Sequence, residues 1–112
     1  MKHEKVMKVN SSDQPVEAHG QTILASGATI GLRLWREGQR EHDKEASSRE
    51  YETAGYVICG NAELEMDGQV TKLGPGDSWI VPKGKEHRYR ILDEFEAVEA
   101  TSPPAHIMAR DL

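Results

Sequence analysis

Apolar and polar residues alternate with a period of two in several short stretches of this chain. In the stretch 62–66, Ala62, Leu64 and Met66 alternate with two glutamates, and in the stretch 30–35 an isoleucine and two leucines share one parity. Because the side chains of a strand point alternately to its two faces, both stretches predict strands that pack one face against a core. Apolar residues nowhere recur at helical spacing over three turns, so no long helix is expected.

Glycine, proline and aspartate mark the turns between these strands. The stretch 73–87 holds two Gly/Pro corners around a short apolar strand; its Pro75-Gly76 pair suits a type II turn, and Asp67-Gly68 is a strong hairpin signal. Strands are predicted at residues 22–25, 29–35, 51–59, 62–66, 70–73, 78–81, 87–92 and 94–101, with an edge strand and a loop in residues 1–20. Short strands at intervals of roughly 8–12 residues indicate an all-β sandwich or barrel.

The length of 112 residues fits a single domain, residues 1–112, with a core at about 22–101 and a C-terminal tail. Nineteen acidic residues against fourteen basic ones give a net charge of -5, which opposes binding to nucleic acid or to an anionic membrane surface. Residues 1–8 lack the apolar core of a signal peptide, and no apolar run is long enough to span a bilayer.

Cys59 is the single cysteine of the chain. It has no partner for an intrachain disulfide, which favours a reducing compartment and a cytoplasmic location. Its parity is that of Val57 in the same predicted strand, so Cys59 is expected to be buried as a small hydrophobic residue.

Four residues of the stretch 73–87 have the spacing of a known motif. Gly76, Pro82, Gly84 and His87 follow one another with five, one and two residues between them. This spacing resembles the second signature motif of the cupin superfamily. The resemblance implies a small single-domain cupin, an all-β jelly-roll β-barrel whose mouth in typical members holds a divalent metal on three histidines and one glutamate.

An upstream stretch resembles the first cupin motif in part. Gly38 stands at its start, His42 matches the first histidine of the motif and Gly60 its closing glycine. The whole resemblance covers about residues 30–101.

Two ligand positions of the first motif depart from the family pattern. Lys44 stands where the second histidine is expected, and an ammonium ion has no lone pair to give a metal. Counting back from Gly60, the glutamate position falls on Thr53, with Glu52 one residue earlier. Since a shift of one residue turns a side chain to the other face, Glu52 is expected to reach the interior through a bulge at Gly55.

The resemblance therefore implies a metal site of His42, His87 and Glu52. Two imidazoles and a carboxylate suit a divalent metal such as iron, manganese, nickel or zinc, with open positions for water or substrate. The alternative is that both histidines are satisfied polar residues at the mouth of a barrel that binds no metal.

Lys44 and Tyr89 are candidate catalytic residues beside the metal ligands. Lys44 has the parity of His42, and Tyr89 and Tyr51 have parities that direct them to a pocket. The lysine would hold an anionic substrate or pair with Glu52, and a tyrosine hydroxyl would act as an acid or hydrogen-bond donor. The alternatives are a solvated surface charge for Lys44 and packing roles for the tyrosines.

Three functions remain open at this point. The first is a cytoplasmic metal-binding cupin, as an enzyme of the oxygenase or isomerase class, that acts on a small polar or anionic molecule. The second is a binding or sensing module without metal, and the third is a metal-free acid–base catalyst of the isomerase type that uses His87 with Tyr89. Unpaired strand edges at residues 1–25 also predict a homodimer, and neither nucleic acid nor a membrane is expected as a partner.

Overall fold

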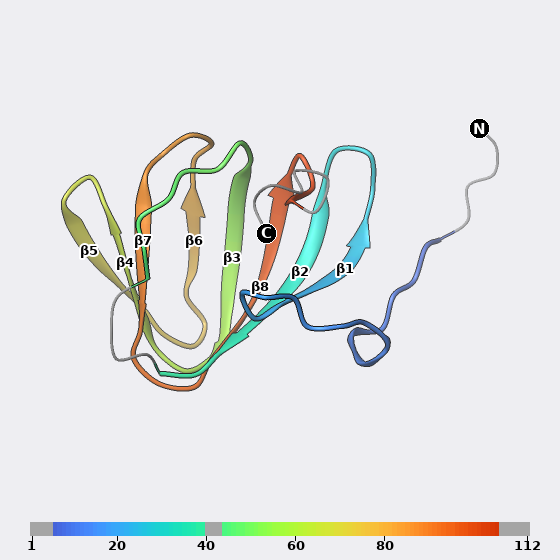
Figure 1. Ribbon diagram of the computed structural model, residues 1–112, viewed down its shortest axis with the longest axis horizontal. Coiled ribbons are helices and arrows are strands. Elements are labelled where there is room, and N and C mark those ends of the chain that lie inside the picture. Colours follow the sequence, from blue (N-terminus) through green and yellow to red (C-terminus); the bar gives the residue numbers. More distant parts are fainter. Residues whose placement is uncertain (1–5, 40–43, 106–112) are drawn as a thin grey trace.

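Two antiparallel sheets contain all the strands of the computed structural model, which describes residues 6–39 and 44–105 (Figure 1). The elements in chain order are the 3-10 helix η1 (Ser11–Asp13) and the strands β1 (Gln21–Ser26), β2 (Gly31–Glu37), β3 (Glu52–Cys59), β4 (Ala62–Met66), β5 (Gln69–Leu73), β6 (Ser78–Val81), β7 (His87–Ile91) and β8 (Phe95–Ser102). One sheet has the order β1-β2-β8-β3-β6 and the other β5-β4-β7. The fold is all-β, as the spacing of strands and turns predicts, and its two sheets are consistent with the jelly roll that the cupin resemblance implies.

The predicted turns form with the expected backbone geometry. Asp67 and Gly68 join β4 to β5 with φ angles of 56° and 77°, and two positive φ angles match the twist of a two-residue hairpin. At the corner before β6, the amide of Asp77 donates to the carbonyl of Gly74 at 2.9 Å, and Gly76 has a φ of 90°. This is the type II geometry in which glycine follows proline.

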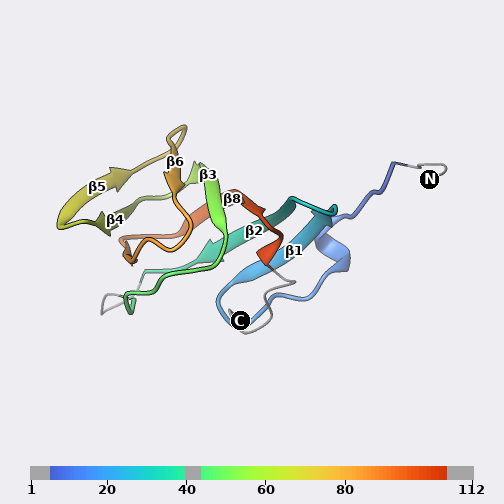
Figure 2. The same ribbon diagram turned by 90° about the horizontal axis from the view of Figure 1, so that it is seen from above.

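Buried side chains from both sheets form one hydrophobic core, and Figure 2 shows the strands that carry them from above. The five-stranded sheet contributes inward residues and the three-stranded sheet covers them, and the buried cluster consists of Trp35, Val57, Ala62, Leu64, Leu73, Trp79, Val81, Ile91, Phe95 and Ala97. The alternation predicted for β4 is confirmed, since Ala62 and Leu64 are buried and Met66 packs against the cluster. The sheets therefore meet through the faces that the period-two pattern assigns in β4.

In β2, by contrast, the packed face is opposite to the predicted one. Leu32 is 40% exposed and lies on the outer face of the five-stranded sheet, whereas Arg33 and Trp35 are buried on the inner face. Ile30, just before the strand, is 53% exposed; Leu34, on the same face as Leu32, is 8% exposed but does not belong to the core cluster between the sheets. Apolar side chains lie on both faces of β2, and the face with the leucines is the more hydrophobic of the two in the sequence. The prediction therefore assigned the leucine face to the interior.

Residues 6–20 do not form the predicted edge strand. Their regular structure is the short helix η1, whose amide at Ser12 is capped by the side chain of Asn10. Val6 and Met7 are exposed, and Figure 1 shows this segment running away from β1. Within residues 6–39 and 44–105, none of the strand pairings includes residues 6–20.

Candidate functional site

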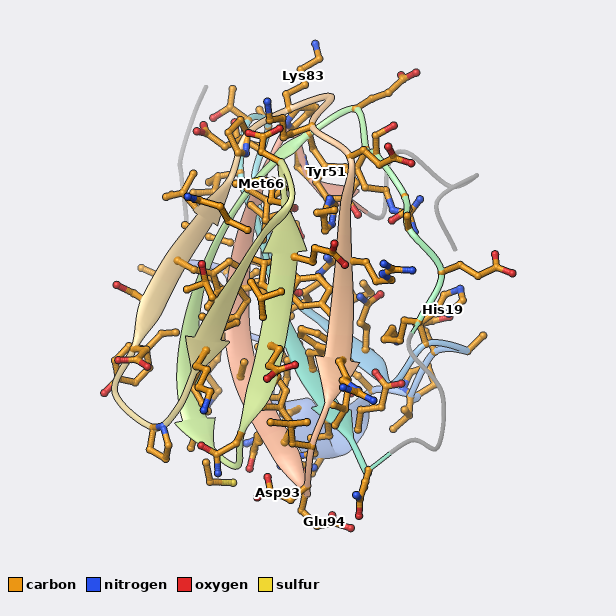
Figure 3. All side chains as sticks on the ribbon, turned by 90° about the vertical axis from the view of Figure 1, so that its left-hand side faces the viewer. His19, Tyr51, Met66, Lys83, Asp93 and Glu94 are labelled. Carbon is orange, nitrogen blue, oxygen red and sulfur yellow. The ribbon has the colours of Figure 1, made fainter. Side chains whose placement is uncertain are left out.

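A pocket with a volume of about 580 Å³ opens between the two sheets, within the usual size range of small-molecule sites. Both sheets and the segment 44–51 contribute to it, and its lining includes His19, Gln21, Arg33, Trp35, Lys44, Ser47, Arg49, Tyr51, Thr53, His87, Tyr89 and Glu99. Figure 3 shows Tyr51 toward the end of the barrel that carries Lys83, with Asp93 and Glu94 at the opposite end.

The register of the five-stranded sheet places charged and apolar side chains in one inward row. Arg33 of β2 lies opposite Glu99 of β8, Glu99 lies opposite Gly55 of β3, and Gly55 lies opposite Trp79 of β6. A Cβ atom at Gly55 would overlap the six-membered ring of Trp79. The glycine therefore leaves room for the indole next to the buried charges.

Arg33 and Glu99 form a buried ion pair in this row. Arg33 Nε donates to Glu99 Oε1 at 2.7 Å, and the exposed fractions of the two side chains are 9% and 2%. Arg33 Nη1 also donates to the hydroxyl of Tyr51 at 3.5 Å, and the guanidinium lies 5.5 Å from the centre of that ring. Burial alone would lower the pKa of Arg33, but Glu99 and Tyr51 outweigh it and raise the pKa, so Arg33 stays charged.

Tyr89 of β7 closes the pocket from the three-stranded sheet. Its hydroxyl accepts a hydrogen bond from Trp79 Nε1 at 3.0 Å, and its ring meets Trp35 edge-on at 4.9 Å. Burial and, next, the negative charge of Glu99 raise the pKa of Tyr89. Tyr89 therefore keeps its proton and presents a neutral hydroxyl.

His87 has its tautomer fixed by a backbone carbonyl. Its Nδ1 lies 2.9 Å from the carbonyl oxygen of Lys85, and because a carbonyl oxygen accepts, Nδ1 carries the hydrogen. In the neutral ring the lone pair is then on Nε2. The backbone of His87 exchanges two hydrogen bonds of 2.9 Å with Ser47, which holds the segment 44–51 alongside β7. This arrangement leaves a lone pair on Nε2 of His87, as a base or a metal ligand requires.

Lys44 lines the pocket, but its partner differs from the predicted one. Its ammonium donates to both carboxylate oxygens of Glu37, at 2.8 and 2.9 Å, and lies 5.7 Å from a ring centre of Trp35. The predicted partner, Glu52, is not involved. The charge of Lys44 is therefore largely neutralised within the protein.

The prediction that Glu52 faces the interior is wrong. Glu52 is exposed, while Thr53 is 6% exposed and lines the pocket. The pairing of β3 with β8 runs without a shift from Glu52 to Val57, so no bulge at Gly55 turns Glu52 inward. The physical reason is strand parity, which puts neighbouring side chains on opposite faces.

A register shift does occur further along β3, between Val57 and Cys59. It turns Cys59 outward, so the prediction of a buried thiol is also wrong: Cys59 is exposed and free of disulfides. Its sulfur lies 3.8 Å from Glu96 Oε1.

The predicted ligand His42 lies outside the described residues. Within residues 6–39 and 44–105, no group of three or more His, Cys, Asp or Glu side chains is arranged to hold a metal ion. Of the predicted metal ligands, His87 is the one that the structure places in the pocket. The described residues therefore do not supply the donor set that a divalent metal requires.

Three charged residues of the pocket were missed as site residues from the sequence. Arg33 stands between two leucines, and Arg49 belongs to a polar loop, so neither gives a signal of burial. Glu99 does carry one, because it shares the parity of Phe95 and Ala97 in β8. A charged residue on the apolar parity of a buried strand is the sequence signal that could have identified Glu99.

Comparisons with known proteins match this chain to a family model and to two curated proteins. A family model described as "Cupin domain" matches residues 34–101. Among curated proteins, the chain is 31% identical over 78 residues to the polyketide synthase CurC of Streptomyces cyaneus, a match that covers 68% of this chain and 48% of that protein. It is 33% identical over 57 residues to an uncharacterized protein of Aquifex aeolicus, covering 51% and 47%. The match spans about half the length of both curated relatives.

Solved structures share the fold. KdgF from Halomonas sp. has a TM-score of 0.72 at 24% identity, with 89% of this chain and 94% of that chain covered. An RmlC-like cupin from Shewanella frigidimarina has a TM-score of 0.72 at 17% identity, with 88% and 92% covered. At these identities the likeness concerns the arrangement of strands.

Proposed function

Since this chain belongs to the cupin domain family, we propose that it binds a small polar molecule with an anionic group in the pocket between its two sheets. The observation that carries this proposal is Arg49. Its guanidinium lines the pocket and has no hydrogen-bond or ion-pair partner among the side chains of residues 6–39 and 44–105. A guanidinium with free donors beside a polar cavity is a binding group for carboxylate or phosphate.

Thermal denaturation with two matched probes tests this function. Gluconate and sorbitol have the same six-carbon chain and differ in the carboxylate. At ten times its Kd a ligand of the folded state adds about 1.4 kcal/mol of stability, which raises the Tm by several degrees. We expect gluconate to raise the Tm and sorbitol to leave it unchanged; equal shifts, or none with either probe, would contradict the proposal.

The proposed binding does not depend on a metal, because the described residues do not fit one. A metal held by His42 and His87 stays a prediction of the family resemblance. Metal analysis of protein purified without an affinity tag measures it, with His87→Ala as the variant that removes the pocket ligand.

Acid–base catalysis is a second candidate function, and the tautomer of His87 favours it. With Nδ1 bound to the Lys85 carbonyl, Nε2 is free to take a proton from a carbon next to a carbonyl group and to return it. The neutral hydroxyl of Tyr89 would donate a hydrogen bond to the oxygen that gains charge. Lys44 is less suited to chemistry because Glu37 holds its ammonium.

Deuterium exchange measures this second function. We expect the methylene protons of 2-oxobutanoate in D2O to exchange faster with the wild-type protein than with His87→Gln. His19→Gln is the matched control, since His19 also lines the pocket. Exchange that is unchanged in His87→Gln would remove this candidate.

We also propose that the chain forms a homodimer through the outer face of its five-stranded sheet. Two outward rows cross this sheet without a charged residue; the register aligns Thr22, Leu34, Val98, Tyr56 and Ser78 in one, and Leu32, Ala100, Ala54 and Ile80 in the other. Tyr56 and Ile80 are about half exposed. Arg36 and Glu96 form an ion pair of 3.0 Å beside these rows on the same face, and the outer face of the other sheet carries one between Arg88 and Glu65 at 2.7 Å. Uncharged rows let two copies of this face stack without opposing like charges.

Light scattering of Ile80→Lys and Val70→Lys tests the dimer. Val70 is also exposed, at 58%, but lies on β5 of the other sheet, so its variant is the matched control. We expect Ile80→Lys to be a monomer of 12.5 kDa and Val70→Lys to keep the dimer mass. A wild-type mass of one chain would contradict the proposal.

A cytoplasmic location is proposed on the exposed, free thiol of Cys59, because such thiols persist in reducing compartments. No helix in the described part of the chain has the length and hydropathy of a membrane span. Cell fractionation with antibody detection measures the location.

A further inference from the structure

We propose that Arg33, Glu99 and Tyr51 form the recognition centre of this pocket, and that they select a small hydroxy acid. The inference rests on the proposed binding function and adds the class of ligand. Arg33 and Tyr51 would donate hydrogen bonds to the same carboxylate that Arg49 attracts, and Glu99 would accept one from a neighbouring hydroxyl.

A contribution to stability alone does not explain why the protein has this buried ion pair. Arg33 and Glu99 lie in a row that otherwise holds Ile23, Gly55 and Trp79, which are apolar. Taking two charges out of water costs more than their attraction returns in many buried pairs, and apolar residues of similar volume often serve the fold as well or better. Because the pair stands on the wall of a cavity, its presence is better explained by what enters that cavity.

Both members of the pair keep unused hydrogen-bonding atoms. Arg33 uses Nε for Glu99 and Nη1 for Tyr51, while Nη2 has no partner among the described residues. Glu99 uses Oε1 for Arg33, and its Oε2 has no partner there either, although the side chain is 2% exposed. Buried polar atoms are rarely left unpaired, so these two atoms call for a ligand that satisfies them.

The hydroxyl of Tyr51 adds a second donor. It accepts a hydrogen bond from Arg33 Nη1, so its own hydrogen points elsewhere. Tyr51 is 3% exposed and lines the pocket. Donors from Arg33 and Tyr51 beside the acceptor Oε2 of Glu99 match a molecule that has an anionic acceptor and a donor hydroxyl close together.

A hydroxy acid has both groups. A simple carboxylate such as hexanoate would satisfy Arg33 but leave Glu99 facing an apolar chain, which is a repulsive contact for a buried carboxylate. A neutral polyol such as sorbitol would satisfy Glu99 but leave Arg33 without its anion. The pocket is therefore expected to bind hexanoate and sorbitol more weakly than a hydroxy acid.

Calorimetric titration with gluconate and hexanoate tests the inference. The probes share a six-carbon chain and a carboxylate and differ in their hydroxyl groups. We expect the wild-type protein to bind gluconate at least tenfold more tightly than hexanoate. In the double variant Arg33→Met with Glu99→Leu, which replaces the pair by apolar residues, this preference is expected to fall below threefold.

A second variant keeps the test open if the double variant fails to fold. Glu99→Gln retains the side-chain volume and removes the charge, and we expect it to lose most of the preference for gluconate while circular dichroism shows an intact fold. Binding of both probes with equal affinity to the wild-type protein, or an unchanged preference in these variants, would overturn the inference and leave the proposed anion binding intact. Binding of neither probe would overturn both.

Discussion

Arg33 and Glu99 lie directly opposite each other on β2 and β8, with Nε and Oε1 2.7 Å apart and both side chains buried. A buried charge is stabilised by the opposite charge of its partner, because water does not reach it. Removing one member therefore leaves an uncompensated buried charge, whereas removing both leaves none.

The first prediction follows from this relationship. Glu99→Leu is expected to lower the free energy of unfolding by about 3–5 kcal/mol, and the double variant Arg33→Met with Glu99→Leu should recover most of that loss. Urea denaturation of the wild-type protein and the variants measures it. A double variant less stable than Glu99→Leu would show that the pair stabilises the fold beyond mutual neutralisation.

The second prediction concerns the space above Gly55. Gly55→Ala is expected to destabilise the protein by about 1–3 kcal/mol, because the new Cβ meets the Trp79 ring and forces it to move. Gly27→Ala is the matched control, since a Cβ there has its nearest neighbour, the carbonyl oxygen of Ile30, at an ordinary 3.8 Å. Equal effects of the two substitutions in urea denaturation would contradict this account of the sheet.

The sequence predicted the turns and most strands because their signals are local. Asp67-Gly68 and Pro75-Gly76 need no information from the rest of the chain to adopt their turns. The alternation in β4 assigned its buried face correctly, since its other face holds two glutamates. In β2 the same reasoning failed, because apolar residues occupy both faces and the more apolar one, with Leu32, is on the outside.

The candidate site could be predicted from the sequence less completely than the fold. The motif with His87 led to the pocket, but the pairing of Arg33 with Glu99 spans 66 positions and depends on the order of strands in the sheet. The expectation for Glu52 failed because it required a bulge at Gly55, while the register shift in β3 falls later. Glu99 has the parity of the buried residues Phe95 and Ala97, but the sequence does not show the buried cation that makes a carboxylate tolerable there.

The third prediction uses the raised pKa of Tyr89. In the unfolded chain a tyrosine loses its proton near pH 10, while in the folded protein burial and Glu99 hold the proton to higher pH. The unfolded state therefore binds fewer protons above about pH 10, and stability falls as the pH rises through this range. We expect the free energy of unfolding to fall more steeply above pH 10 for the wild-type protein than for Tyr89→Phe. Parallel pH profiles would contradict the raised pKa.

The fourth prediction separates anion binding from metal binding. Because the described residues do not fit a metal, treatment with EDTA is expected to leave the Kd for gluconate unchanged within twofold. Calorimetry before and after dialysis against EDTA measures this. A loss of binding that zinc, nickel, manganese or iron restores would instead support a metal at His42 and His87.

The central claim is that the pocket binds an anion through a guanidinium that has no partner in the described protein. Calorimetric titration of gluconate into the wild-type protein, Arg49→Gln and Lys83→Gln measures it most directly, because Lys83 lies in the exposed turn after β6 and does not line the pocket. Loss of a charged hydrogen bond is expected to weaken binding to Arg49→Gln by about 10- to 100-fold, with Lys83→Gln within twofold of the wild-type protein. Equal affinity of Arg49→Gln and the wild-type protein, or an equal loss in Lys83→Gln, would contradict the account.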